Sequence, residues 1–179
     1  MAGFNITGNN SEYQKSNVAE TRRKHRWVFS KLGDVLQQGE LIYLKSAARP
    51  KFDFEEVTMH HDQEEAYFAG KQKWSAIDFE WYDVQQPVNV SKKLWDWLGI
   101  VNPKLADKNG ETCVNAPRVY KGRATLEMTG NCDTSRGEET WDFYGMWPKS
   151  CDWSSLDYST NEILMIKVNA RYDKAMRTK

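Results

Sequence analysis

Two carboxylates at strand spacing are the first candidates for chemistry in this sequence. Asp78 and Glu80 alternate with large apolar residues in the segment 74–83, which is typical of a strand with two different faces. Residues two apart on a strand share a face and lie about 6.6–7 Å apart along its axis, which would suit acid–base work on a sugar. No pocket-forming loop or Gly-rich element accompanies the pair. A charged open face is therefore the favoured interpretation.

Histidines offer little for catalysis or for metal binding. The chain has 3 of them, and His60 and His61 are adjacent. Adjacent strand residues point to opposite faces, so these two are not expected to ligate one metal ion. The sequence has no Gly-rich phosphate loop, no Gly-x-Ser-x-Gly, no His-Glu-x-x-His and no Cys-x-x-Cys. We expect no catalytic residue, no metal, no cofactor and no enzyme activity.

The charge balance argues against a protein held to nucleic acid mainly by a basic patch. There are 25 basic and 25 acidic residues. A basic run at 22–26 could contact phosphate, but it also suits a solvated strand start or a partner for acidic groups of another subunit. The neutral total does not exclude a pore through which nucleic acid passes.

The size of the chain predicts one domain. It has 179 residues, of which 40% are hydrophobic and 13% aromatic, with 8 Trp. Residues 1–21 are polar and are expected to form an arm that is loose in the monomer, so the domain spans 22–179. No apolar run is long enough to span a membrane, and the N-terminus lacks the pattern of a secretory signal. Large aromatic side chains suit sheet packing and buried subunit contacts.

Alternating apolar and polar residues predict a mainly β chain with one short helix. The helix is expected over 91–98, with Ser91 as its N-cap and Gly99 just past its end. Turn signals occur at 70–73 and from Gly145 to Pro148, and 102–117 is expected to be a polar linker. Strands are expected over 41–44, 52–59, 74–83, 118–129, 138–144 and 163–172.

The last predicted strand has an unusual second face. Its core face is apolar: Leu164, Ile166, Val168, Ala170 and Tyr172. Its other face mixes apolar and charged groups: Ile163, Met165, Lys167, Asn169 and Arg171. Such a mixture is odd for a surface that meets only water. It indicates a surface partly covered by a neighbouring subunit.

The closing sequence and the order of elements resemble the tail tube proteins of contractile-tailed bacteriophages. The resemblance covers roughly residues 22–174. It is carried by Trp147-Pro148, a short polar loop with Trp153, the stretch 157–163 (DYSTNEI) and a last strand ending at Asp173. The N-terminal arm, the His60-His61 pair and the cysteines are not part of it, which leaves open a specialised relative of the tube proteins.

The resemblance implies a fold and an assembly. The fold is two packed antiparallel sheets, a β-sandwich or barrel, with one short flanking α-helix and with strands that join neighbours into a ring-shaped inner β-barrel. The assembly is homo-hexameric rings stacked into a hollow tube that conducts DNA from capsid to host. Its partners would be identical rings, the tail sheath protein outside, baseplate and neck proteins at the ends, and tape-measure protein and phage DNA in the lumen. The protein would be made in the host cytoplasm and reside in the virion.

Three sets of residues follow as candidates. Lumen-lining candidates are Asp78, Glu80, Glu127 and Asn169. Inter-subunit candidates are Trp147, Pro148, Trp153, Asp157 and Tyr158. The cysteines, Cys113, Cys132 and Cys151, have no metal-type spacing and are odd in number, so at least one thiol is free or pairs between chains. Reduced thiols are one interpretation, and cross-links between subunits of an exposed virion are the other.

Three alternatives remain open at this point. The nearest is a tube initiator or terminator of the same tail, which would form one ring and not polymerise. The second is the inner tube of a phage-derived contractile injection system. The third belongs to another class of protein, a free β-sandwich binding module.

Overall fold

The computed structural model describes residues 24–33, 36, 41–106, 114–129 and 139–179. The strands are β1 (Trp27–Leu32), β2 (Leu44–Ala47), β3 (Phe52–His61), β4 (Glu64–Trp74), β5 (Ile77–Tyr82), β6 (Gly122–Met128), β7 (Glu139–Asp152), β8 (Met165–Arg171) and β9 (Lys174–Arg177). The helices are α2 (Val90–Val101), α3 (Pro103–Ala106) and α4 (Pro117–Tyr120). The expected arm at 1–21, Cys113 and Cys132 lie outside the described residues. Among those described, no helix combines the length and the apolar character needed to cross a bilayer.

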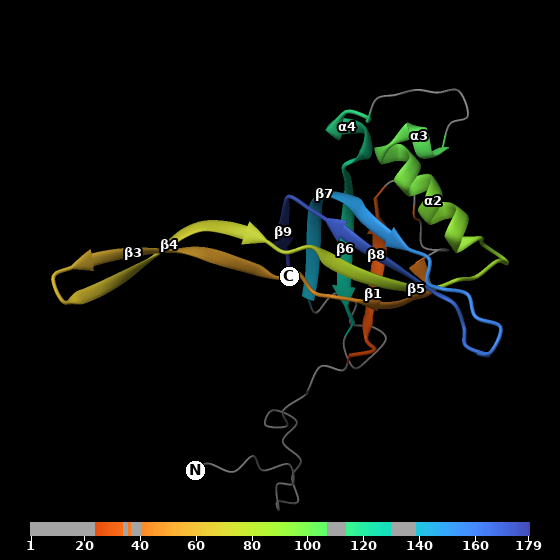
Figure 1. Ribbon diagram of the computed structural model, residues 1–179, viewed down its shortest axis with the longest axis horizontal. Coiled ribbons are helices and arrows are strands. Elements are labelled where there is room, and N and C mark those ends of the chain that lie inside the picture. Colours follow the sequence, from red (N-terminus) through yellow and green to blue (C-terminus); the bar gives the residue numbers. More distant parts are fainter. Residues whose placement is uncertain (1–23, 34–35, 37–40, 107–113, 130–138) are drawn as a thin grey trace, which may run out of the picture.

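One strand, β7, is shared by two antiparallel layers. The strand order is β1-β6-β7-β8-β5-β2, with β9 also paired to β7. The first part of β7 pairs with β6 and β9, and from Trp147 onward it pairs with β8. The strand therefore leaves one layer and enters the other, as Figure 1 shows. The expected fold of two packed antiparallel sheets is confirmed.

Aromatic side chains fill the space between the layers. Phe29 of β1 meets Phe79 of β5 edge to face, with ring centroids 5.4 Å apart, and stacks near Phe143 of β7 at 6.2 Å. All three side chains are buried. Such pairs add specific geometry to the large apolar area that each ring removes from water. The core therefore fixes how the two layers face each other.

The flanking helix α2 is confirmed, but its ends differ from the prediction. Asn89 is the N-cap, because its Oδ1 accepts a hydrogen bond from the backbone N–H of Lys92 at 2.8 Å. Gly99 is buried inside the helix and does not end it; the C-cap is Asn102. Two short helices, α3 and α4, lie beside α2 in Figure 1, where a polar linker was expected.

The predicted break from Gly145 to Pro148 is wrong, because β7 runs through it. Gly145 has φ +67°, a left-handed conformation that glycine adopts without steric cost. Pro148 stands beside an irregularity in the pairing with β8, between Pro148 and Ser150. Proline lacks a backbone N–H, so it is tolerated in a sheet at such a bulge. The two residues bend the strand from one layer to the other without ending it.

Three further boundaries also differ. The expected turn at 70–73 lies within β4, and the chain reverses at Asp62-Gln63 instead. A Cβ on Gly70 would lie 2.8 Å from the backbone oxygen of Glu55, so this glycine permits close approach of two strands and makes no turn. The strand expected at 41–44 is β2, which begins and ends three residues further along the chain, at Leu44–Ala47. The strand expected at 118–129 begins after α4.

Adding a single methyl group at Gly145, where β7 bends, should strongly destabilise the fold. A Cβ there would lie 2.2 Å from Oδ2 of Asp173, whose carboxylate accepts hydrogen bonds from Nζ of Lys121 at 2.7 and 2.8 Å. We expect Gly145→Ala to lower the free energy of unfolding by about 2–4 kcal/mol, from the left-handed backbone and the overpacking together. Chemical denaturation of the two proteins measures the difference.

The double variant separates the two causes. Asp173→Ala alone loses a surface ion pair and should cost roughly 1 kcal/mol or less. Together with Gly145→Ala it removes the collision and leaves only the backbone strain, so the double variant should be more stable than the sum of the two losses implies. Unchanged stability of Gly145→Ala would contradict the role of this glycine.

Candidate functional site

The β3–β4 hairpin stands away from the rest of the fold. Strands β3 and β4 pair only with each other, and Figure 1 shows them extending well beyond the two layers. Asp62 has φ +55° at the two-residue turn, a conformation that Asp and Asn adopt more readily than most residues. An isolated two-stranded hairpin is marginally stable in water. Both of its edges also present unpaired backbone groups.

The outer part of the hairpin has one apolar face without cover. Val57 lies opposite Phe68 and Met59 lies opposite Ala66, so these four side chains share a face. Val57, Met59 and Phe68 are 53%, 52% and 53% exposed. The opposite face is more polar, with His60 beside Glu65 at 3.2 Å between Nδ1 and Oε1. An apolar face of this kind indicates a protein–protein contact.

The root of the hairpin is the end where Phe52 begins β3 and Trp74 ends β4. Aromatic contacts hold this root against the core. Phe143 packs edge to face on Tyr172, with ring centroids 5.2 Å apart, and Tyr172 meets Trp74 at 5.7 Å. Trp74 meets Phe52 at 5.2 Å, and Phe52 meets Phe54 at 5.6 Å. A continuous series of rings thus runs from the interior onto the hairpin. This series holds the direction in which the hairpin leaves the domain.

The sequence analysis missed this hairpin because Gly70 was taken for a turn. A local signal was present: apolar residues alternate before and after Asp62-Gln63, at 57 and 59 and again at 66 and 68. Two alternating segments around a two-residue turn are typical of a hairpin.

Three of the four lumen candidates lie together on the outer face of β5 and β8. Asp78 pairs with Asn169 across the strands, and Nδ2 of Asn169 donates to Oδ1 of Asp78 at 2.7 Å. Glu80 lies two residues along β5 on the same face. Glu127 is on β6 in the other layer, paired with Val28 and with Thr140. Glu127 therefore does not share a surface with the other three.

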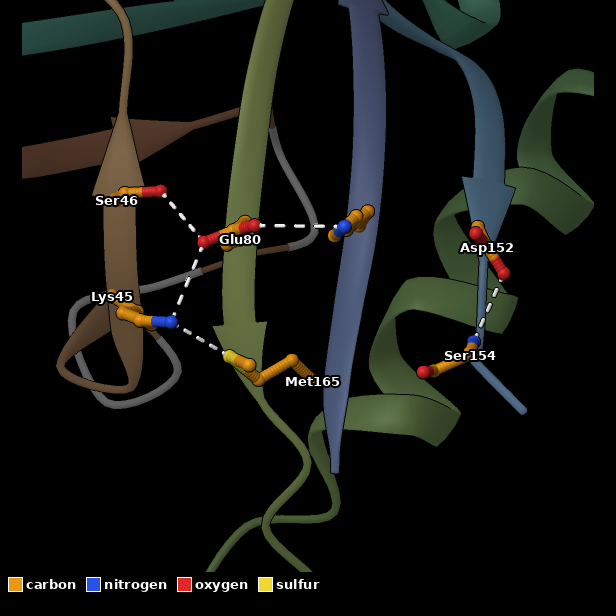
Figure 2. Close-up of polar contacts among 7 residues, drawn as sticks. Lys45, Ser46, Glu80, Asp152, Ser154 and Met165 are labelled. Atoms are coloured by element: carbon orange, nitrogen blue, oxygen red, sulfur yellow. Dashed lines mark hydrogen bonds and ion pairs between the residues drawn. The ribbon is translucent and has the colours of Figure 1, made fainter. Parts of the chain in front are cut away.

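Glu80 is the centre of a small polar cluster. Its carboxylate lies 3.6 Å from Nζ of Lys45 and 3.9 Å from Nζ of Lys167, and it accepts a hydrogen bond from Oγ of Ser46 at 3.3 Å. Figure 2 shows Lys45 and Ser46 reaching Glu80 from β2. Two lysines beside one glutamate make this face mixed in charge.

The five inter-subunit candidates fall into two groups. Three of them make contacts within the chain. Trp147 packs on Tyr120 with ring centroids 5.8 Å apart, and Pro148 is buried. Trp153 donates a hydrogen bond from Nε1 to Oγ of Ser91 at 2.9 Å. The other two are exposed.

Asp157 and Tyr158 lie in the loop between β7 and β8. Asp157 accepts hydrogen bonds from the backbone N–H and the hydroxyl of Ser159, both at 2.8 Å, and these bonds lower its pKa. Tyr158 is fully exposed. Of the five candidates, these two have exposed side chains, whereas Trp147 and Trp153 are half-buried.

Cys151 is a free and partly buried thiol on β7. Burial, with a smaller contribution from the charge of Asp152, raises its pKa to about 12. The thiolate is the reactive form of cysteine, so this side chain is a poor nucleophile in the folded chain. The suggested cross-link through Cys151 remains a prediction.

The described residues contain no group of three or more His, Cys, Asp and Glu side chains placed to hold a metal ion. Concave regions are shallow. One of about 600 Å³ lies at the start of α2, where Trp95 and Trp153 meet with ring centroids 5.5 Å apart. Another of about 450 Å³ lies at the root of the hairpin, beside Trp74 and Trp147.

The fold is similar to that of several solved proteins of contractile injection machines. The sheath/tube terminator of an extracellular contractile injection system (PVC, extended state) is 15% identical over 90% of this chain and 99% of that chain, with a TM-score of 0.67. The tube-terminating cap of the anti-feeding prophage is 16% identical over 93% and 99%, also with a TM-score of 0.67. A chain of the PVC sheath–tube complex is 15% identical over 94% and 99%, at 0.66.

At these identities the likeness establishes a contractile-tail tube-related fold. The sequence matches no protein-family model. It also matches no curated protein.

The environment of Cys151 predicts slow chemistry. At pH 8 we expect Cys151 of the folded protein to react with iodoacetamide roughly a thousandfold more slowly than an ordinary exposed cysteine, because so little thiolate is present. Mass spectrometry of the peptide that contains Cys151 follows the reaction. The same protein unfolded in guanidinium is the control and should react at the ordinary rate. Equal rates in the two states would contradict the assigned pKa.

Proposed function

We propose that this chain is a structural protein that forms a ring at the end of the tube of a contractile tail or contractile injection machine. In this role it is a tube terminator and performs no catalysis. The observation that carries the proposal is the β3–β4 hairpin, whose apolar face is exposed and whose two outer edges pair with no other described strand. A ring would cover the face and the edges, because neighbouring copies can pair the edges and bury the apolar face.

The structural likenesses support the terminator role over that of a tube subunit. Two of the three similar structures are named as a sheath/tube terminator and a tube-terminating cap, and each is matched over 99% of its length. The third comes from a sheath–tube complex and has nearly the same TM-score. A tube subunit that stacks into long tubes is therefore the second candidate.

The remaining parts of the assembly belong to the same proposal. A ring of six copies would enclose a channel for DNA or for protein cargo, with the sheath outside and the tube beneath. The outer face of β5 and β8 carries polar side chains, as a channel lining requires, and the two lysines beside Glu80 limit its net charge. A lining of low net charge would let a charged cargo pass without strong attraction.

Electron microscopy of the purified protein, with analytical ultracentrifugation, tests the proposal. We expect single rings that do not lengthen on concentration. Long tubes would favour the tube-subunit role. A protein that stays monomeric at the highest soluble concentration, and that binds a small ligand saturably, would overturn the proposal and favour a free binding module.

Two neighbouring residues of the hairpin provide a matched test of the apolar face. Phe68 and Tyr67 are adjacent on β4 and are 53% and 61% exposed, but they lie on opposite faces. We expect Phe68→Thr to weaken ring formation at least about tenfold, because about half of a phenylalanine side chain loses its apolar burial at each contact. Tyr67→Thr should have a smaller effect. Sedimentation over a concentration series measures both, and equal effects would exclude this face from the contact.

A further inference from the structure

We propose that the acidic end of the hairpin in one copy docks into the recess at the hairpin root of the next copy. This contact rests on the proposed ring and names the surfaces that form it. Copies would then join head to tail, each giving its hairpin end to one neighbour and its root to the other.

The end of the hairpin carries an excess of negative charge. Asp62, Glu64 and Glu65 surround the turn and are exposed. Glu65 already contacts His60 and accepts a hydrogen bond from the hydroxyl of Tyr67 at 2.7 Å. Within the described part of the chain, Asp62 and Glu64 have no ion-pair partner. Their charges are available to another molecule.

The recess at the root carries the complementary charge. It has a volume of about 450 Å³, and Lys73, Lys121 and Arg171 reach it from three different elements. Lys121 is already neutralised by Asp173 at 2.7 Å. Lys73 and Arg171 have no carboxylate partner among the described residues. Two unpaired cations therefore remain in the recess.

Aromatic rings make the walls of the recess. Trp74 and Tyr172 meet at 5.7 Å between ring centroids, Tyr120 and Trp147 meet at 5.8 Å, and all four rings line the recess. Walls of large rings lower the local dielectric constant and strengthen an ion pair formed inside them. Tryptophan, tyrosine and arginine are also the residues that contribute most to binding energy at protein interfaces.

The hairpin cannot fill the recess of its own chain. Strand β4 has 11 residues, which at about 3.3 Å per residue separates the turn from the root by roughly 36 Å. The hairpin extends outward from the domain in Figure 1 and does not fold back. An acidic hairpin end bound in this recess would therefore come from a second copy. A contact between two different surfaces of identical copies closes into a ring or continues as a filament.

Charge reversal at the two surfaces tests the contact. The end variant is Asp62→Lys with Glu64→Lys, and the root variant is Lys73→Glu with Arg171→Glu. We expect neither variant to form rings alone, because each presents like charges at every contact. Mixing the two should restore rings, since alternating copies satisfy every contact when the number of subunits is even.

A chain that carries all four substitutions is the matched control. It regains the formal net charge of the original chain, +0, and should form rings by itself. Thermal unfolding of each variant establishes that it is folded, as expected for exposed substitutions.

The outcomes separate the two proposals. If the original chain forms rings and the single-surface variants form them equally well, or if the mixture fails to restore them, the docking contact is wrong and the ring remains. If the original chain forms no rings at all, the proposed function itself is wrong.

Discussion

The whole fold depends on the bend in β7. One 14-residue strand supplies hydrogen bonds to β6 and β9 in one layer and to β8 in the other. The bend is possible because Gly145 adopts a left-handed conformation and Pro148 needs no hydrogen-bond partner for a backbone N–H. Once the strand turns, Phe143 and the β8 residues on the same inner side are brought toward Phe29 and Phe79. The core and the sheet order are consequences of that single geometry.

The same core also sets the direction of the hairpin, the surface that we propose for assembly. Tyr172 lies directly after β8 and contacts both Phe143 inside the domain and Trp74 at the root of the hairpin. The hairpin is thus tied to the interior by aromatic packing while its outer part stays uncovered. Aromatic side chains thus fix the direction of a hairpin whose outer apolar face is exposed. Such an arrangement is expected where another molecule covers that face. The ring that we propose would provide this cover, and a free module would not.

The mixed outer face of β8 has a related explanation. Lys167 lies near Glu80, and Asn169 donates to Asp78, so these two polar residues of the row contact β5. Met165 lies beside Lys45 of β2, with Nζ donating to the thioether sulfur at 2.9 Å. The outer face of β8, whose mixed composition is unusual for a single strand, is thus part of a polar network that spans β2, β5 and β8. Lys167 is thus paired within the chain, whereas Arg171, at the end of the row, lines the recess that we propose as a contact with another copy.

The sequence alone determined the features that depend on local periodicity. Alternation placed Ile77, Phe79 and Trp81 in the core and Asp78 and Glu80 outside it, because successive strand residues must point to opposite faces. The same rule found the core face of β8 from Ile166 onward, and the apolar spacing at 94–98 found α2. These predictions hold because they need no knowledge of any other segment. Leu164, expected on that core face, was predicted wrongly, because it precedes β8 and is exposed.

Only the tertiary structure decided what depends on a distant partner. Gly70 and Gly145 look like turns in the sequence, but one permits close approach of β3 and β4 and the other bends β7, and both uses are set by neighbouring strands. The sequence grouped Glu127 with Asp78, Glu80 and Asn169 because all four are polar strand residues, whereas strand pairing puts Glu127 in the other layer. The recess that brings Lys73 and Arg171 together joins the ends of two strands far apart in the chain. Local patterns fix the face on which a side chain lies, and long-range pairing fixes which faces meet.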